Sequence, residues 1–375
     1  MPWPEPRFTT NADTTITDNL TGLVWVPDGN IMPARDPGWD TDGTANDGAV
    51  TWHHALDYVA KLNAEHYLGH NDWRLPNINE LLSLFNADEA NLADWLSSEG
   101  FTNIQQKDSQ EGFYWSSTTL AYYVEAAGQV SMSFGGEMGA SQKEDSIHFV
   151  WPVCNGKGIV APAPIWETGQ TISYAPGDDG DIQAGVDWPG QRFTDHGNGT
   201  VTDNLTGLMW TQDANAPGPT ECSPGTYKTW QQALDYVSCL NNNHFLGYTD
   251  WRLPNRTELH SLTDFSQNDP ALPAGHPFIN VQYSMQYSSY WSSTVYTQIT
   301  ELGWTVIIWS GGISLDYRAD NFFDSNYVLP VLGGQAGSQE CVTWTDVISK
   351  YNAYVSGQDV WTDVITCYNE YVSHQ

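Results

Sequence analysis

Four motifs occur twice along the chain, in the same order each time. They are TDNLTGL at 17–23 and 202–208, ALDYV at 55–59 and 233–237, DWRLPN at 72–77 and 250–255, and YWSST at 114–118 and 290–294. The offset between the copies falls from 185 at the first motif to 178 at the middle motifs and 176 at YWSST. A fixed order with slowly changing spacing indicates one duplicated domain with insertions in its loops. The sequence therefore predicts two units of the same fold.

The duplication also sets the expected domain boundaries. We expect a first domain at 3–155, a linker and N-terminal header of the second domain at 156–189, a second domain at 190–335 and a tail at 341–375. Each copy is long enough to bury a core of its own. Copy two has a longer header than copy one, which begins at MPWPEPRF, so we expect that the natural precursor extended beyond Met1.

Each copy carries the signals of two helices followed by strands. Trp230, Ala233, Leu234, Val237 and Leu240 share one helical face, and Thr229 with Gln232 predicts a capping box, with Thr51 at the same place in copy one. A second box is predicted by Asn77 with Glu80 and by Asn255 with Glu258. Strands are expected at YWSST, 304–309 and 327–332. Helices followed by antiparallel strands and long loops indicate an α+β domain.

The tail contains a smaller repeat, WTDVISKYNAYVS at 344–356 and WTDVITCYNEYVS at 361–373. Its apolar residues fall on one helical face, which predicts a short helical hairpin. Two short helices bury little by themselves, so we expect the hairpin to dock, through self-association or attachment.

DWRLPN and YWSST are interpreted as framework. In DWRLPN the aspartate and the arginine on either side of the tryptophan suit an internal ion pair beside a buried indole. These residues are Asp72, Trp73 and Arg74 in copy one and Asp250, Trp251 and Arg252 in copy two. YWSST is expected to form a central strand with Trp115 and Trp291 in the core. Neither motif supplies a nucleophile with a base, and no GxSxG sequence is present. We therefore expect no enzymatic activity.

Charge restricts the class of partner. The chain has 13 Lys and Arg against 45 Asp and Glu, a formal net charge of −32. Such a surface repels nucleic acid. No apolar run reaches the roughly 18 residues of a membrane span, so no transmembrane segment is expected.

Five cysteines fit an exported chain. Cys222 and Cys239 flank the insertion and first helix of copy two without counterparts in copy one, which predicts a disulfide. Cys154, Cys341 and Cys367 remain, and one of them could be free or pair between chains. A zinc site is the weaker interpretation, because no CxxC or His spacing accompanies them.

The ordered set RFTD, GTVTDNLTGLMW, TWQQALDYVSCLN, GYTDWRLPNRTELHSL and YWSST resembles the Lcl C-terminal domain family, named for a bacterial collagen-like surface adhesin. The resemblance covers nearly all of 3–335, twice. It implies two C-type-lectin-like domains, a bacterial extracellular location, secreted or on the cell surface, and a role in adhesion. The adhesin's binding of sulfated polysaccharides is not carried over, because this chain lacks a basic surface.

Acidic loops make calcium a possible cofactor. DTDGTANDG at 40–48 places Asp40, Asp42 and Asp47 in a Gly-bearing loop similar to the first half of a calcium loop, although the terminal Glu of an EF-hand is missing. GDDGD at 177–181 is a second acidic cluster. A solvated acidic turn is the simpler interpretation of both, and more so of the second.

The segment after YWSST differs most between the copies and is the predicted ligand surface. In copy two it offers aromatic and polar groups together: Tyr296, Trp309, Tyr317, Arg318, Asp320, Asn321 and Asp324. Drift without function is the competing interpretation. The leading hypothesis is a secreted or cell-surface binding protein for a glycan or surface protein. The alternative is a self-assembling subunit of an extracellular filament or sheath.

Overall fold

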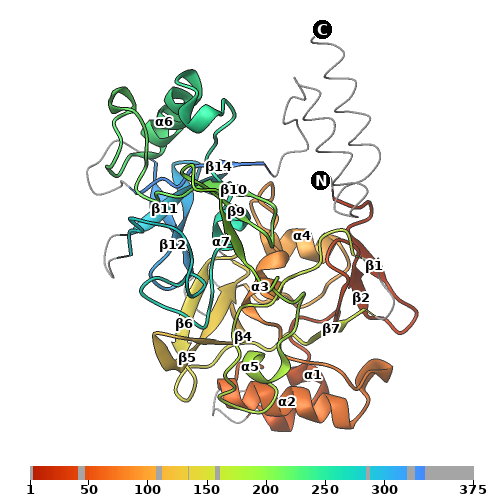
Figure 1. Cartoon of the computed structure of the whole chain (residues 1–375). Coiled ribbons are helices and arrows are strands. Elements are labelled where there is room, and N and C mark those ends of the chain that lie inside the picture. Colours follow the sequence, from red (N-terminus) through yellow and green to blue (C-terminus); the bar gives the residue numbers. More distant parts are fainter. Residues whose placement is uncertain are drawn as a thin grey trace, which may run out of the picture. The chain divides into compact units, whose positions relative to one another are not determined.

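Each copy of the repeat forms one four-stranded and one three-stranded antiparallel sheet with helices beside them (Figure 1). The computed structural model describes residues 3–40, 47–106, 112–133, 135–156, 161–283, 288–318 and 326–333. The predicted α+β class and its duplication are thereby confirmed. The tail at 341–375, for which a helical hairpin was predicted, lies outside the described residues.

In copy one the four-stranded sheet has the order β1-β2-β3-β7 and the three-stranded sheet the order β4-β5-β6. The strands are β1 (Phe8–Thr10), β2 (Ile16–Asp18), β3 (Leu23–Trp25), β4 (Phe113–Leu120), β5 (Tyr123–Ser131), β6 (Met138–Gln142) and β7 (Val153–Asn155). The helices are α1 (Met32–Arg35), α2 (Trp52–Ala64), α3 (Ile78–Ser83) and α4 (Leu92–Ser98).

Copy two repeats this topology, with the orders β8-β9-β10-β14 and β11-β12-β13. The strands are β8 (Phe193–Asp195), β9 (Thr200–Asp203), β10 (Met209–Thr211), β11 (Ser289–Val295), β12 (Leu302–Ile307), β13 (Gly312–Tyr317) and β14 (Val331–Leu332). Its helices are α6 (Trp230–Asn242) and α7 (Arg256–His260), while α5 (Asp179–Ile182) lies in the segment that connects the copies.

The helix starts follow the predicted caps. Asn77 and Asn255 each accept the backbone N–H of the glutamate three residues on, and that glutamate accepts the N–H of the asparagine. Thr229 and Gln232 form the same reciprocal pair at the start of α6. Thr51 stands at the N-cap of α2, but its side chain makes no capping hydrogen bond.

The tryptophans of the repeated motifs lie in the core. Trp73 and Trp251 are 2% exposed, and Trp115 and Trp291 are fully buried. Each indole N–H of the last two donates to a backbone carbonyl, that of Val50 or that of Lys228, at 2.7 Å. The YWSST strands β4 and β11 are end members of their three-stranded sheets, in which β5 and β12 are the middle strands. On the other side, Tyr114 and Tyr290 form isolated parallel bridges with Phe149 and Tyr327, so each YWSST strand has hydrogen-bonded neighbours on both sides.

The arginines of DWRLPN pair with the glutamates of the capping boxes. Arg74 makes a bidentate contact with Glu80, and Arg252 makes the equivalent contact with Glu258. The expected ion pair within each motif is therefore replaced by one that joins the motif to the following helix. Asp72 and Asp250 are exposed.

A buried arginine joins the two copies. The Arg256 guanidinium lies 3.4 Å from the ring centre of Phe85 in copy one and 4.6 Å from that of Trp304 in copy two. It donates to the carbonyl oxygens of Gly135 and Gly136 of copy one at 3.1 and 3.3 Å. Burial lowers the pKa of Arg256 to about 9. Copy one has Ile78 at the matching position, so this contact is specific to copy two.

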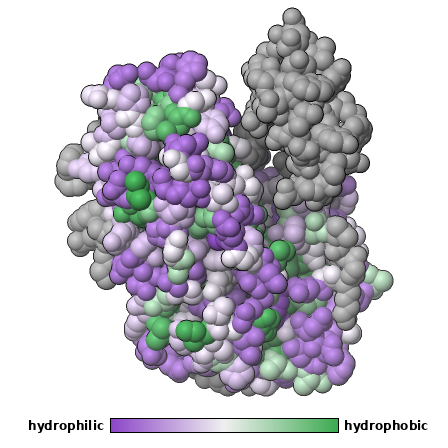
Figure 2. Space-filling model, in the orientation of Figure 1, coloured by the Kyte–Doolittle hydropathy of each residue, from purple (hydrophilic) through white to green (hydrophobic). Residues whose placement is uncertain are grey.

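Hydrophilic residues cover most of the face shown in Figure 2, and hydrophobic residues appear there in small separate groups. This distribution agrees with a chain that carries a formal net charge of −32. In the described part of the chain, no helix has the length and apolar character needed to cross a membrane.

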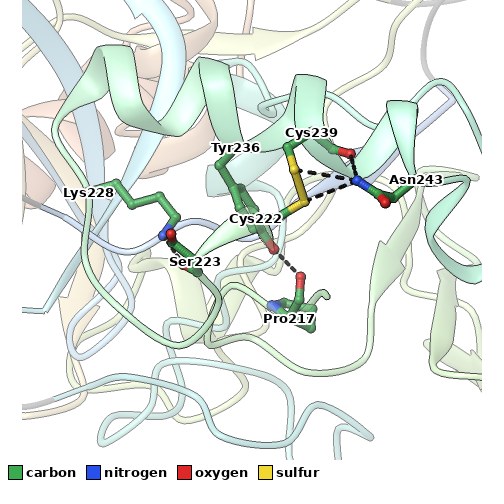
Figure 3. Close-up of a disulfide and its surroundings, with 7 residues drawn as sticks. All are labelled: Pro217, Cys222, Ser223, Lys228, Tyr236, Cys239 and Asn243. Atoms are coloured by element: carbon green, nitrogen blue, oxygen red, sulfur yellow. Dashed lines mark hydrogen bonds between the residues drawn. A yellow bond between two sulfur atoms is a disulfide. The ribbon is translucent and has the colours of Figure 1, made fainter. Parts of the chain in front are cut away.

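The predicted disulfide between Cys222 and Cys239 is confirmed (Figure 3). It ties the loop before α6 to that helix, and the side-chain amide of Asn243 approaches both sulfur atoms at 3.6 Å. The hydroxyl of Tyr236 on the same helix donates to the carbonyl of Pro217. The loop is thus held to the helix at two points.

The two arginine–glutamate pairs allow a matched stability test. Arg74 and Glu80 are 6% and 1% exposed, whereas Arg252 and Glu258 are 24% and 15% exposed. Glu80→Gln should lower the free energy of unfolding by roughly 3–5 kcal/mol, because it leaves a buried charge unpaired. Glu258→Gln should cost about 1–2 kcal/mol, since water reaches its arginine. Urea denaturation measures both, and equal losses would contradict this explanation.

Candidate functional site

The segment that follows copy one folds back onto copy one. Trp166 and Val186 form a bridge at its two ends, and α5 lies between them. We call residues 164–188 the covering segment. Four of its polar side chains are buried: Thr168, Gln170, Asp178 and Asp179. The GDDGD cluster is therefore not the solvated turn that the sequence suggested.

Asp179 is one of two buried acids of the covering segment. Its carboxylate accepts hydrogen bonds from the hydroxyls of Thr118 in YWSST and of Thr168, both at 2.7 Å. Burial raises the pKa of Asp179 to about 7, against the opposing effect of these two hydroxyls. The second acid, Asp178, caps α5 by accepting the backbone N–H of Asp181.

Amide groups fix the covering segment to the strand and to the helix start. The Gln170 side chain accepts the backbone N–H of Thr119 at 2.9 Å and donates to the carbonyl of Thr119 at 2.6 Å. Asn77 donates to the carbonyl of Ala184 at 2.9 Å. The segment thus binds a polar face made by α3 and β4.

A lysine stacked on an indole completes this face. The Lys143 ammonium lies 4.2 Å from the ring centre of Trp52 and 4.8 Å from that of Tyr174 in the covering segment. It donates to the hydroxyl of Thr119 at 2.7 Å. Burial lowers the pKa of Lys143 to about 8, although the Asp178 carboxylate acts in the opposite direction.

Copy two has the same face, and there it is open. The residues that match Asn77, Ser117, Thr118, Thr119 and Lys143 of copy one are Asn255, Ser293, Thr294, Val295 and Arg318. The first five are buried, whereas each of the second five is exposed or half-buried. We call these five residues of copy two, with Trp230, the open face.

The framework beneath the two faces is the same. The hydroxyls of Thr118 and Thr294 each accept the backbone N–H of the first helical residue at 3.0 Å. The N–H of Ser117 and of Ser293 each donate to a proline carbonyl at 2.8 Å. The open face therefore presents groups in the arrangement that binds the covering segment in copy one.

Arg318 occupies the place of the stacked lysine. Its guanidinium lies 3.9 Å from the ring centre of Trp230, and its Nη1 donates to the carbonyl of Thr300 at 2.6 Å. Its Nε is buried and has no hydrogen-bond partner among the described residues. A buried N–H without a partner is costly, so this group favours an incoming acceptor.

The residues of the predicted ligand surface separate into three groups. Tyr317 is 55% exposed, and Arg318, which follows it in the chain, belongs to the open face. Tyr296 is buried against Trp304, and Trp309 stacks on Tyr122 of copy one at 4.6 Å, so both lie near the contact between the copies. Asp320, Asn321 and Asp324 lie outside the described residues.

The acidic loop of copy one is described only at its ends. Asp40 accepts the backbone N–H of Gly48 at 3.0 Å, and Asp47 accepts that of Ala49 at 2.9 Å. Asp42 lies outside the described residues. Calcium binding by this loop stays a prediction.

A family model for the Lcl C-terminal domain matches residues 14–154 and 199–331, more than half of the chain. The chain belongs to the Lcl C-terminal domain family. Its two matched regions are the two copies, so the protein is a tandem of Lcl C-terminal domains. A search of curated protein sequences finds no match.

The predicted ligand surface included Arg318 of the second Lcl C-terminal domain, but Lys143 of the first was not predicted from the sequence. The segments that begin at these two residues differ too much in sequence to align by eye, KEDSIH against RADNFF. The available signal was the tryptophan: Trp52 and Trp230 open equivalent helices, and each carries a stacked cation. Nothing in the composition of the 156–189 linker indicated that it covers the first domain.

Asp179 makes the stability of the first Lcl C-terminal domain depend on pH. Its pKa is raised from 3.8 to about 7 in the folded chain, so the folded state binds the extra proton between these values. The free energy of unfolding should therefore fall as pH rises from about 4 to about 7, by up to about 4 kcal/mol at 1.36 kcal/mol per pKa unit. Asp179→Asn should remove this fall.

Urea denaturation between pH 4 and 8 measures the effect. Asp181→Asn is the matched control, because this neighbouring carboxylate is exposed. Equal pH dependence in the parent chain and in Asp179→Asn would contradict the assignment.

Proposed function

We propose that this protein is a non-catalytic binding protein, secreted or on the cell surface, that recognises its ligand through the open face of the second domain. The observation that carries the proposal is the difference between the two copies. One framework binds a polypeptide segment in the first domain, and in the second domain the matching positions are exposed or half-buried. A duplicated domain with one occupied and one open face is suited to recognition.

The first domain indicates what chemistry the open face accepts. The covering segment contributes a carboxylate to a threonine hydroxyl, an amide to the strand backbone, and an aromatic ring and an acid near the stacked lysine. Arg318, Thr294 and Asn255 are the matching groups on the open face. The ligand is therefore a glycan or surface protein that presents a carboxylate beside hydrogen-bonding groups.

An extracellular location is supported by chemistry as well as by family. Disulfides such as Cys222–Cys239 persist in oxidising compartments and are rare in the reducing cytosol. The net charge of −32 disfavours binding to nucleic acid and to sulfated polysaccharides, because these polymers are also negatively charged. The proposal includes a C-type-lectin-like fold for the domains that present the binding surface.

Self-assembly is the second candidate function. The open face has the groups that bind residues 164–188 in the first domain, so the same segment of a second chain has complementary chemistry. If residues 164–188 of each chain bound the open face of the next chain, the chains would be linked head to tail into the filament or sheath that the sequence suggested.

Blocking the open face tests the proposal. Ser293 is exposed, so Ser293→Tyr should fold normally and place a bulky ring over the face. On glycan and protein arrays, ligands bound by the parent chain should be lost with Ser293→Tyr and weakened at least tenfold with Arg318→Gln. Ile279→Tyr, at a position that is 51% exposed, controls for an added surface ring.

Two outcomes would contradict the proposal. Binding that survives both substitutions would place recognition elsewhere. A parent chain that grows into polymers with concentration in light scattering, and stops doing so with Ser293→Tyr, would favour assembly over ligand display.

A further inference from the structure

Copy one contains a cluster of metal-binding side chains that is not repeated at the matching positions of copy two. Cys154, on β7, His70 and Asp72 place one sulfur, one nitrogen and one oxygen atom within 4.8 Å of one another. They meet because Arg74 forms a backbone bridge with Val153, which brings the residues before Arg74 beside the end of β7. Cys154 lies more than eighty positions from His70 and Asp72 in the sequence, so no short spacing motif predicts the cluster.

The distances agree with those between ligands of one zinc ion. His70 Nδ1 lies 3.6 Å from Cys154 Sγ and 3.5 Å from Asp72 Oδ1. At metal–ligand distances of about 2.0–2.3 Å, tetrahedral coordination separates neighbouring ligand atoms by about 3.3–3.6 Å. The exposed Asp72 carboxylate can rotate to close the remaining gap to sulfur.

A fourth residue orients the imidazole. His70 Nε2 lies 3.2 Å from the Asp13 carboxylate, which favours the tautomer with its proton on Nε2. The lone pair on Nδ1 then points toward Cys154 and Asp72. A carboxylate on the far nitrogen of a ligating histidine is a recurrent feature of zinc sites in proteins.

The comparison between the copies separates this cluster from the shared framework. The positions of His70, Asp72 and Cys154 correspond to Tyr248, Asp250 and Leu332 in copy two. The ring packing is kept, because His70 and Tyr248 both lie against the tryptophan of DWRLPN at 5.0 and 5.8 Å. The framework therefore needs a flat ring at this place but not an imidazole with a thiol.

The geometry points to a Zn²⁺ site formed by Cys154, His70 and Asp72 in copy one, with Asp13 orienting the histidine and water as the fourth ligand. Thiolate and imidazole ligands favour zinc over calcium or magnesium, which take oxygen ligands. Zinc binding would displace the thiol proton of Cys154 to solvent. The site shares no residue with the open face or with the acidic loop at 40–48.

Zinc and cobalt binding to the full chain test the site. After treatment with a chelator and its removal, titration calorimetry with ZnCl₂ should show one tight site per chain and a higher melting temperature with the metal. Co²⁺ in place of Zn²⁺ should give a thiolate-to-cobalt absorption band. Both signals should be lost with Cys154→Ser, and affinity should fall at least tenfold with Asp72→Asn.

Two controls keep the test decisive. Asp72 is exposed, so Asp72→Asn should fold even if Cys154→Ser does not. The double variant Cys341→Ser/Cys367→Ser removes the two tail cysteines and should retain both signals. The assignment is overturned if zinc does not bind, if Asp72→Asn binds as tightly as the parent, or if the cobalt band depends on the tail cysteines instead.

Discussion

The buried contact between Arg74 and Glu80 is the interaction on which the first domain depends. Glu80 holds the guanidinium of Arg74 and accepts the backbone N–H of Asn77, so one carboxylate fixes both the DWRLPN turn and the start of α3. Arg74 exchanges both backbone hydrogen bonds with Val153, which docks the last strand against the turn. Because an unpaired buried charge costs several kcal/mol, none of these segments can move independently. Arg252, Glu258 and Val331 repeat the arrangement in copy two.

This framework serves different purposes in the two copies. In the first, α3 and β4 are covered by residues 164–188, and the end of the last strand brings a thiol beside an imidazole. In the second, the same helix–strand junction is open and carries an arginine on its tryptophan. The copies also meet through Arg256, which replaces an isoleucine of copy one. Function is thus proposed where the copies differ, above a framework where they agree.

Much of the fold was predictable because its signals are local. The capping boxes at Asn77, Thr229 and Asn255 each involve residues three positions apart, and the helical face of α6 repeats within two turns. The disulfide could be predicted because both cysteines occur in one loop and the helix that follows it, without counterparts in copy one. Burial of the repeated tryptophans followed from their presence in both copies. The order of the strands within each sheet could not be predicted from local signals, and the YWSST strands are end members of their three-stranded sheets.

The sequence by itself determined that two α+β units of the Lcl C-terminal domain family would form, with these caps, this disulfide and this buried aromatic framework. Only the tertiary structure decided that the linker covers the first domain, that Glu80 is the partner of Arg74, that Trp309 packs against the other copy, and that His70 meets Cys154. The physical reason is distance along the chain. Caps and helical faces depend on residues within a few positions, whereas burial and ligand geometry depend on which remote segments the framework brings together.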